Sequence, residues 1–157
     1  MWKAGLIGAA VGLVLGIAGT LIMPPLCNPC AVILLTIGFG VLGARWEGAP
    51  TQQDSVATGA KTGAIAAAGS LLGEIVGAVL NGLIIGPEGA ARLARQFGLP
   101  AAMDPTVYWV TNLGGNCLCG LINIALGAGF GALGGLIWHQ ARGRQAEPAP
   151  PEQEQIE

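Results

Sequence analysis

A long apolar stretch, Thr62–Ile85, with a single carboxylate inside it, Glu74, constrains the fold of this chain more than any other feature. About 20 apolar residues are enough for a helix to cross the hydrocarbon core of a membrane. Small residues recur at every fourth position of the stretch, at Gly69, Gly73 and Gly77, followed by Asn81. Glycines at this spacing let two helix backbones approach closely. The stretch therefore predicts a tightly packed membrane helix. Its carboxylate faces protein or water, because facing lipid costs at least ~2.5–3.5 kcal/mol.

Composition supports a membrane protein and excludes several other classes. Hydrophobic residues make up 52% of the 157 positions and charged residues only 10%, whereas soluble domains carry about 25% charged residues. The 27 glycines follow no three-residue period, which excludes collagen. With 5% aromatic residues and a net charge of -2, the chain has no basic surface for nucleic acid. It also has no nucleophile–base pair, phosphate loop or dinucleotide fingerprint, so we expect no enzyme.

Four apolar segments predict an all-α, polytopic membrane fold. They cover residues of about 4–23, 30–44, 56–85 and 116–138. The first segment ends at Pro24-Pro25, which cannot continue a helix. No small-residue cleavage site follows it, so we expect a retained helix instead of a cleaved signal peptide.

The basic residues predict the orientation of these helices. With a cytoplasmic N-terminus, five of them lie inside, namely Lys3, Arg45, Lys61, Arg142 and Arg144, and only Arg92 and Arg95 lie outside. The positive-inside rule favours this topology. We therefore expect a multi-pass protein of the cell (inner) membrane with both termini in the cytoplasm. The Glu-, Gln- and Pro-rich residues 145–157 are then a disordered cytoplasmic tail.

A shorter helix is expected near residues 88–97, on the outer side. Pro87 precedes it and Gly98 follows it, which are the residues typical of a helix start and end. Leu93 and Phe97 fall on one face, with Arg92 and Arg95 off that face. This pattern indicates either an interfacial helix on the outer leaflet or a segment that caps the bundle.

An internal repeat divides the chain into two tandem helical hairpins. The sequence GFGVLG at 38–43 matches GFGALG at 129–134, and a cysteine pair with a nearby asparagine precedes each copy. Residues 1–50 form the first hairpin and residues 51–144 the second. Repeats with the same orientation are usually related by an axis along the membrane normal.

The four cysteines are candidates for a disulfide or a metal site on the outer face. They are Cys27, Cys30, Cys117 and Cys119. Disulfides persist on an oxidising face, and a bridge between the two pairs would join the hairpins. The Cys-x-x-Cys spacing also fits zinc or an iron–sulfur cluster, although Cys-x-Cys is less usual. Free or lipid-modified thiols are the remaining alternative, and we expect no other cofactor.

Glu74 has two interpretations. In the first, Glu74 binds a proton or cation inside the bundle, together with Asn81 and Asn123. In the second, it is a structural carboxyl that desolvation keeps protonated and that hydrogen-bonds a neighbouring helix. One acid without a second acid or a buried base makes a sparse transport pathway.

Glycine rows occur in three of the four segments. They are Gly8, Gly12 and Gly16, then Gly69, Gly73 and Gly77, and finally Gly127, Gly131 and Gly135. Close helix packing, within or between subunits, explains them better than the lining of an oligomeric pore. With its four helices, glycine rows and outward cysteines, the chain resembles the Tim17/Tim22/Tim23 family of membrane translocase subunits. The resemblance implies a similar style of helix packing, and no functional residue carries over.

Two functions follow from these patterns. The leading one is a non-catalytic membrane protein that self-assembles, or joins a larger membrane complex, through glycine-zipper packing. Its partners are then the lipid bilayer and further copies or subunits. The alternative is an ion or proton channel or transporter that uses the intramembrane carboxylate.

Overall fold

A computed structural model describes residues 2–22, 28–96, 98 and 104–145. These residues form five α-helices and no β-strand: α1 (Trp2–Ile22), α2 (Asn28–Glu47), α3 (Gln52–Ile84), α4 (Gly86–Gln96) and α5 (Pro105–Gln145). All except α4 are long and apolar enough to cross a membrane. The predicted all-α class with four candidate spans is therefore confirmed for this part of the chain. The tail predicted to be disordered lies, from residue 146 onward, outside the described residues, as does Cys27.

Local sequence explains where the two longest helices begin. Thr51 caps α3, because its Oγ1 accepts a hydrogen bond of 3.1 Å from the backbone nitrogen of Asp54. At α5, Asp104 Oδ1 accepts one of 2.7 Å from the backbone nitrogen of Thr106, and Pro105 stands first in the helix. Helix α5 therefore starts well before residue 116, where hydropathy placed the fourth segment. Tyr108 lies in this first part of the helix.

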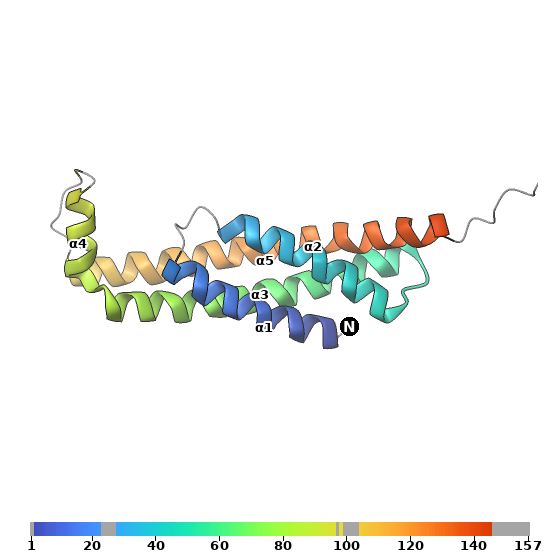
Figure 1. Ribbon diagram of the computed structural model, residues 1–157, viewed down its shortest axis with the longest axis horizontal. Coiled ribbons are helices and arrows are strands. Elements are labelled where there is room, and N and C mark those ends of the chain that lie inside the picture. The colour runs from blue at the N-terminus through green and yellow to red at the C-terminus, as the bar shows by residue number, and fades with distance from the viewer. Residues whose placement is uncertain (1, 23–27, 97, 99–103, 146–157) are drawn as a thin grey trace, which may run out of the picture.

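The four long helices lie side by side, and α4 stands across one end of them (Figure 1). Helices α3 and α5 run antiparallel along the whole length, α1 lies on α3, and α2 lies on both α3 and α5. At the α4 end, Gly86 has a φ of 65°, a left-handed conformation that favours glycine and turns the chain from α3 into α4. Helices α1 and α2 contact each other far less than each contacts the second half of the chain.

The three glycine rows lie against neighbouring helices of the same chain. A Cβ atom built on Gly12 would lie 3.0 Å from the backbone nitrogen of Ser70, and one on Gly16 would lie 2.9 Å from that of Glu74. The rows of α1 and α3 therefore face each other. The row of α5 faces α3, since a Cβ on Gly131 would lie 2.9 Å from the Cα of Gly63. Backbones this close leave no room for any larger side chain.

The repeated glycines of α2 and α5 occupy similar environments. Gly40 and Gly131, which are the third residues of the two repeat copies, lie against each other. Gly38 and Gly129, the first residues of the copies, both face open space. Helices α2 and α5 run in the same direction. Thr36 contacts Gly127 and Gly40 contacts Gly131, so the residue numbers of the contacting residues rise together along the two helices.

The interior is small and polar, whereas the large apolar side chains lie outside. Buried apolar residues are mostly alanines, such as Ala66 and Ala67. Among the fully buried side chains of the described residues, Glu74 has the largest volume, followed by threonines and serines. Leucines, isoleucines and valines are exposed along all four long helices, for example Leu34 at 73% and Leu118 at 62%. A water-soluble bundle has the opposite distribution.

Candidate functional site

A cavity of about 530 Å³ opens between α1, α3 and α5. Helix α2 is too short to cover α5 completely. Thr36 of α2 lies beside Gly127, so the first residue of α2 reaches only about the level of residue 119 of α5, at ~1.5 Å of rise per residue. The bundle therefore has two halves. We call the half around residues 55–70 of α3, where all four long helices meet, the packed half. The half around residues 74–84, beyond the start of α2, is the open half.

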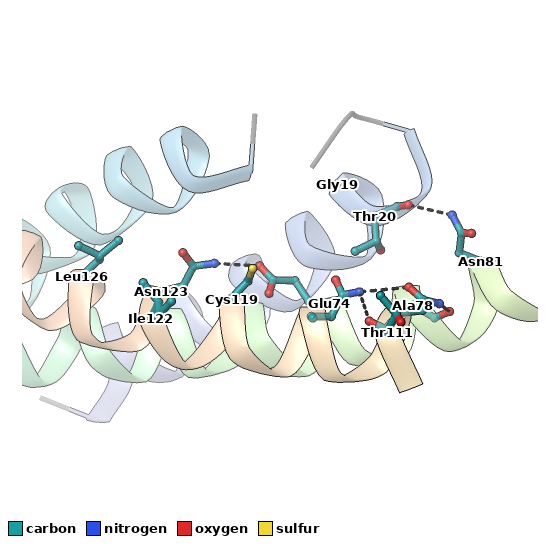
Figure 2. Close-up of a pocket in the computed structure, with 13 residues that line it drawn as sticks. Gly19, Thr20, Glu74, Ala78, Asn81, Thr111, Cys119, Ile122, Asn123 and Leu126 are labelled. Atoms are coloured by element: carbon teal, nitrogen blue, oxygen red, sulfur yellow. Dashed lines mark hydrogen bonds between the residues drawn. The ribbon is translucent and has the colours of Figure 1, made fainter. Parts of the chain in front are cut away.

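Glu74 lines this cavity and is only 2% exposed. Asn123 of α5, itself buried, donates a hydrogen bond of 3.2 Å from Nδ2 to Glu74 Oε1 (Figure 2). The backbone of α1 closes the site from a third direction, since Gly16 leaves no space for a Cβ beside the nitrogen of Glu74. The carboxylate is thus held between three helices and faces the cavity, not the outer surface.

Asn81 lies about two turns further along α3 and lines the same cavity. Its Nδ2 donates a hydrogen bond of 3.1 Å to the backbone oxygen of Thr20, near the end of α1 (Figure 2). The structure therefore brings Glu74, Asn81 and Asn123, the three polar residues singled out in the sequence, around one space. Glu74 and Asn123 are in direct contact, whereas Asn81 stands nearer the end of the bundle that carries α4.

Two further asparagines line the cavity. Sequence reasoning did not assign them to this site. Asn112 donates a hydrogen bond of 3.2 Å from Nδ2 to the oxygen of Ala78, and so joins α5 to α3. Asn116 Nδ2 lies 2.7 Å from the backbone oxygen and 3.2 Å from Oδ1 of Asn112. Asn112, Asn116, Cys119 and Asn123 follow the spacing of one helix face. That spacing would have revealed the polar face if the helix had been extended back to Pro105.

The hydrogen-bonding pattern gives the cavity the chemistry of a cation site. Each amide nitrogen of the four asparagines donates to a protein oxygen. The oxygens Oδ1 of Asn81, Asn116 and Asn123 therefore remain as acceptors, and Glu74 adds a carboxylate, which only accepts when ionised. None of the described lining residues is basic. The lining thus attracts positive charge and offers little to an anion.

The cysteines show no bridge among the residues that the structure describes. Cys30, Cys117 and Cys119 are free and exposed, and Cys119 lines the cavity. No three His, Cys, Asp or Glu side chains of the described residues cluster as metal ligands. A four-thiolate site or a bridge that uses Cys27 remains a prediction, because Cys27 lies outside these residues.

Comparison with known proteins gives no family for this chain. No protein-family description, no curated protein and no solved structure matches it. The cavity and its residues are therefore the basis on which a function is argued.

Proposed function

We propose that this protein is a non-catalytic, multi-pass membrane protein that binds a proton or a small cation at Glu74, reached from one side of the bilayer. The observation that carries the proposal is the buried Glu74–Asn123 pair, which lines a cavity whose described residues include no basic side chain. Carboxylates within membrane helices commonly mark ion or proton pathways. The exposure of large apolar side chains, with small and polar ones inside, supports insertion in lipid.

Access from one side follows from the difference between the two halves. In the open half the cavity extends from Glu74 past Asn81 and Asn112. In the packed half, Gly63 and Gly127 bring α3 and α5 into backbone contact. One chain therefore offers a binding site without a continuous pore, and transport across the membrane would require a rearrangement of these helices or a second copy.

The topology we propose has both termini in the cytoplasm and the open half towards the outer side. Besides the distribution of basic residues, Arg45 at the end of α2 lies 5.8 Å from the ring centre of Trp138 near the end of α5. This pair forms part of a basic and aromatic belt at the cytoplasmic interface. We further propose that the α1/α2 and α3/α5 hairpins are related by an axis along the membrane normal. Labelling of a cysteine at position 145 only from outside intact cells would overturn the topology.

Flux measurements in proteoliposomes test the function. We expect a proton or monovalent-cation flux that Glu74→Gln abolishes, because the amide keeps the shape of the carboxyl but cannot hold a negative charge. Glu88→Gln is the matched control, since Glu88 is exposed on α4, outside the cavity lining. Equal flux in wild type and Glu74→Gln, with both proteins folded by circular dichroism, would refute the role of Glu74.

Assembly into an oligomer or a larger complex is the second candidate. It is favoured by Gly114 and Gly115 of α5, which are exposed and have open space where a Cβ would stand, together with the exposed Thr111. This small-residue face is available to another helix, whereas the three long glycine rows are already occupied within the chain. Native mass spectrometry from nanodiscs should show more than one copy, and Gly114→Leu should reduce that fraction. A monomer at every protein-to-lipid ratio would exclude self-assembly.

A further inference from the structure

The cavity is larger than an inorganic cation requires. Metal ions such as calcium need six to eight oxygen atoms at about 2.3–2.6 Å. Here one carboxylate is the only charged group among the described lining residues. A volume of about 530 Å³ instead falls in the range typical of pockets for organic molecules, roughly 300–1,000 Å³.

The lining is divided into a polar end and an apolar wall. Glu74 and Asn123 form the polar end, where the carboxylate and the amide oxygen both accept hydrogen bonds. Ala78, Ile122 and Leu126 contribute apolar surface to the same cavity. Figure 2 shows Ile122 and Leu126 on α5, close to Asn123. A ligand that matches both parts carries a positively charged hydrogen-bond donor at one end and an apolar body.

The absence of aromatic side chains from the described lining narrows the type of cation. Quaternary ammonium groups have no N–H and are usually held by aromatic faces. The oxygens of Glu74, Asn123 and Asn116 suit a group with several N–H donors. Primary and secondary ammonium groups meet this requirement.

We propose that the cavity binds a lipophilic primary or secondary amine in its ammonium form. The ammonium group donates hydrogen bonds to Glu74 and to Asn123 Oδ1, and the apolar body lies along Ile122 and Leu126. This inference rests on the proposed function, because it names the class of cation that Glu74 holds. A ligand of this kind partitions into the outer leaflet, from which the open half is reached without crossing the packed half.

Three probes of equal length test the ligand class: 4-phenylbutylamine, its trimethylammonium analogue and 4-phenylbutanol. Their binding is measured by isothermal titration calorimetry with the full chain in nanodiscs, and empty nanodiscs correct for partition into lipid. We expect saturable binding of the amine at one site per chain. The affinity of the quaternary analogue and of the alcohol should be lower by at least about tenfold, as expected when hydrogen bonds to a charged group are lost. Equal binding of the alcohol, or no saturable binding of the amine, would overturn the inference.

Variants separate this inference from the proposed function. Glu74→Gln should weaken amine binding about tenfold or more for the same reason. Ile122→Trp should fill the apolar wall and abolish amine binding. Leu118→Trp is its matched control on α5, because Leu118 is 62% exposed and lies outside the lining. Flux that depends on Glu74 without amine binding would leave the proposed function standing and refute the amine. Absence of both would refute both.

Discussion

The packed half and the open half of the bundle use their polar side chains in different ways. In the packed half, hydroxyl groups bond within their own helix: Thr62 Oγ1 donates to the oxygen of Thr58 at 2.8 Å, and Thr36 Oγ1 to that of Ile33 at 3.1 Å. In the open half, three of the four asparagine amides bond between helices, as Asn123 does with Glu74, whereas Asn116 bonds to Asn112 of its own helix. Local bonds need no space between helices, so glycines can bring the backbones together. The bonds from α5 to α3 in the open half instead cross the width of a side chain, whereas α1 stays in close contact with α3 through Gly16 and Gly73.

The comparison teaches that glycine content does not decide by itself where a membrane bundle is tightly packed. Gly114 and Gly115 lie in the open half and face open space. What distinguishes the halves is that asparagine amides bridge helices in the open half, whereas the threonine hydroxyls of the packed half bond within their own helix. Substitutions in each half test this difference, and the first has the largest expected effect.

Gly131→Val should destabilise the packed half strongly. A Cβ there would meet the backbone of Gly59 and Gly63, which has no flexible side chain to move aside. Overpacking typically costs about 1–3 kcal/mol and occasionally more. The measurement is the thermal unfolding midpoint in nanodiscs. Gly129→Val is the control two residues away, where nothing lies within 4 Å, and its midpoint should stay unchanged. Equal effects of the two variants would contradict the packing described.

Asn123→Ala should have the next largest effect, because it removes the donor to the buried Glu74. Loss of one partner of a buried polar group costs about 1–3 kcal/mol. The matched change in the packed half is Thr62→Val, which removes a bond within one helix and should cost clearly less. Reversible unfolding in mixed detergent micelles gives both values. A larger loss for Thr62→Val would break the proposed difference between the halves.

Asn81→Ala should cost less than Asn123→Ala. The bond from Asn81 to the oxygen of Thr20 is partly buried, and hydrogen bonds between membrane helices average about 0.6 kcal/mol. Because this bond holds the end of α1 to α3, its loss should also increase hydrogen exchange in the last turn of α1. Unchanged exchange there, measured by mass spectrometry in nanodiscs, would show that the bond does not position α1.

The smallest effect should come from Asp104, which directly precedes α5 at the end of the bundle that carries α4. The pKa of its carboxyl lies below the ordinary 3.8, chiefly because the backbone N–H of Thr106 donates to it, followed by the Thr106 hydroxyl and the Val107 N–H. A carboxyl whose pKa is lower in the folded than in the unfolded protein contributes stability at pH values above its unfolded pKa. This stability is lost as the pH falls through the folded pKa. Aspartate side chains titrate at about pH 5 to pH 2. Over this range the wild type should therefore lose stability more steeply than Asp104→Ala. Parallel melting curves for the two proteins would show that the cap contributes nothing.

Much of this architecture is readable from the sequence, since hydropathy located the four candidate spans and the isolated polar residues pointed to Glu74, Asn81 and Asn123. The start of α5 was missed because Tyr108–Asn116 is less apolar, and the Asp104-Pro105 start signal was not used. Asn112 was missed for the same reason. The neighbours of the glycine rows could not be predicted at all. Periodicity shows that Gly69, Gly73 and Gly77 share a face, but not that α1 covers it.

The preference of α1 and α2 for the second half of the chain over each other has a consequence for synthesis. A ribosome adds about 5–20 residues per second, so both helices wait for roughly 5–20 s before α3 and α5 are complete. During this interval the glycine faces of α1 and α2 lack most of their native neighbours and are open to wrong ones, including helices of other nascent chains. A pulse-labelled chain should therefore stay sensitive to a membrane protease until residues near Gly135 have been inserted, and then become resistant in one step.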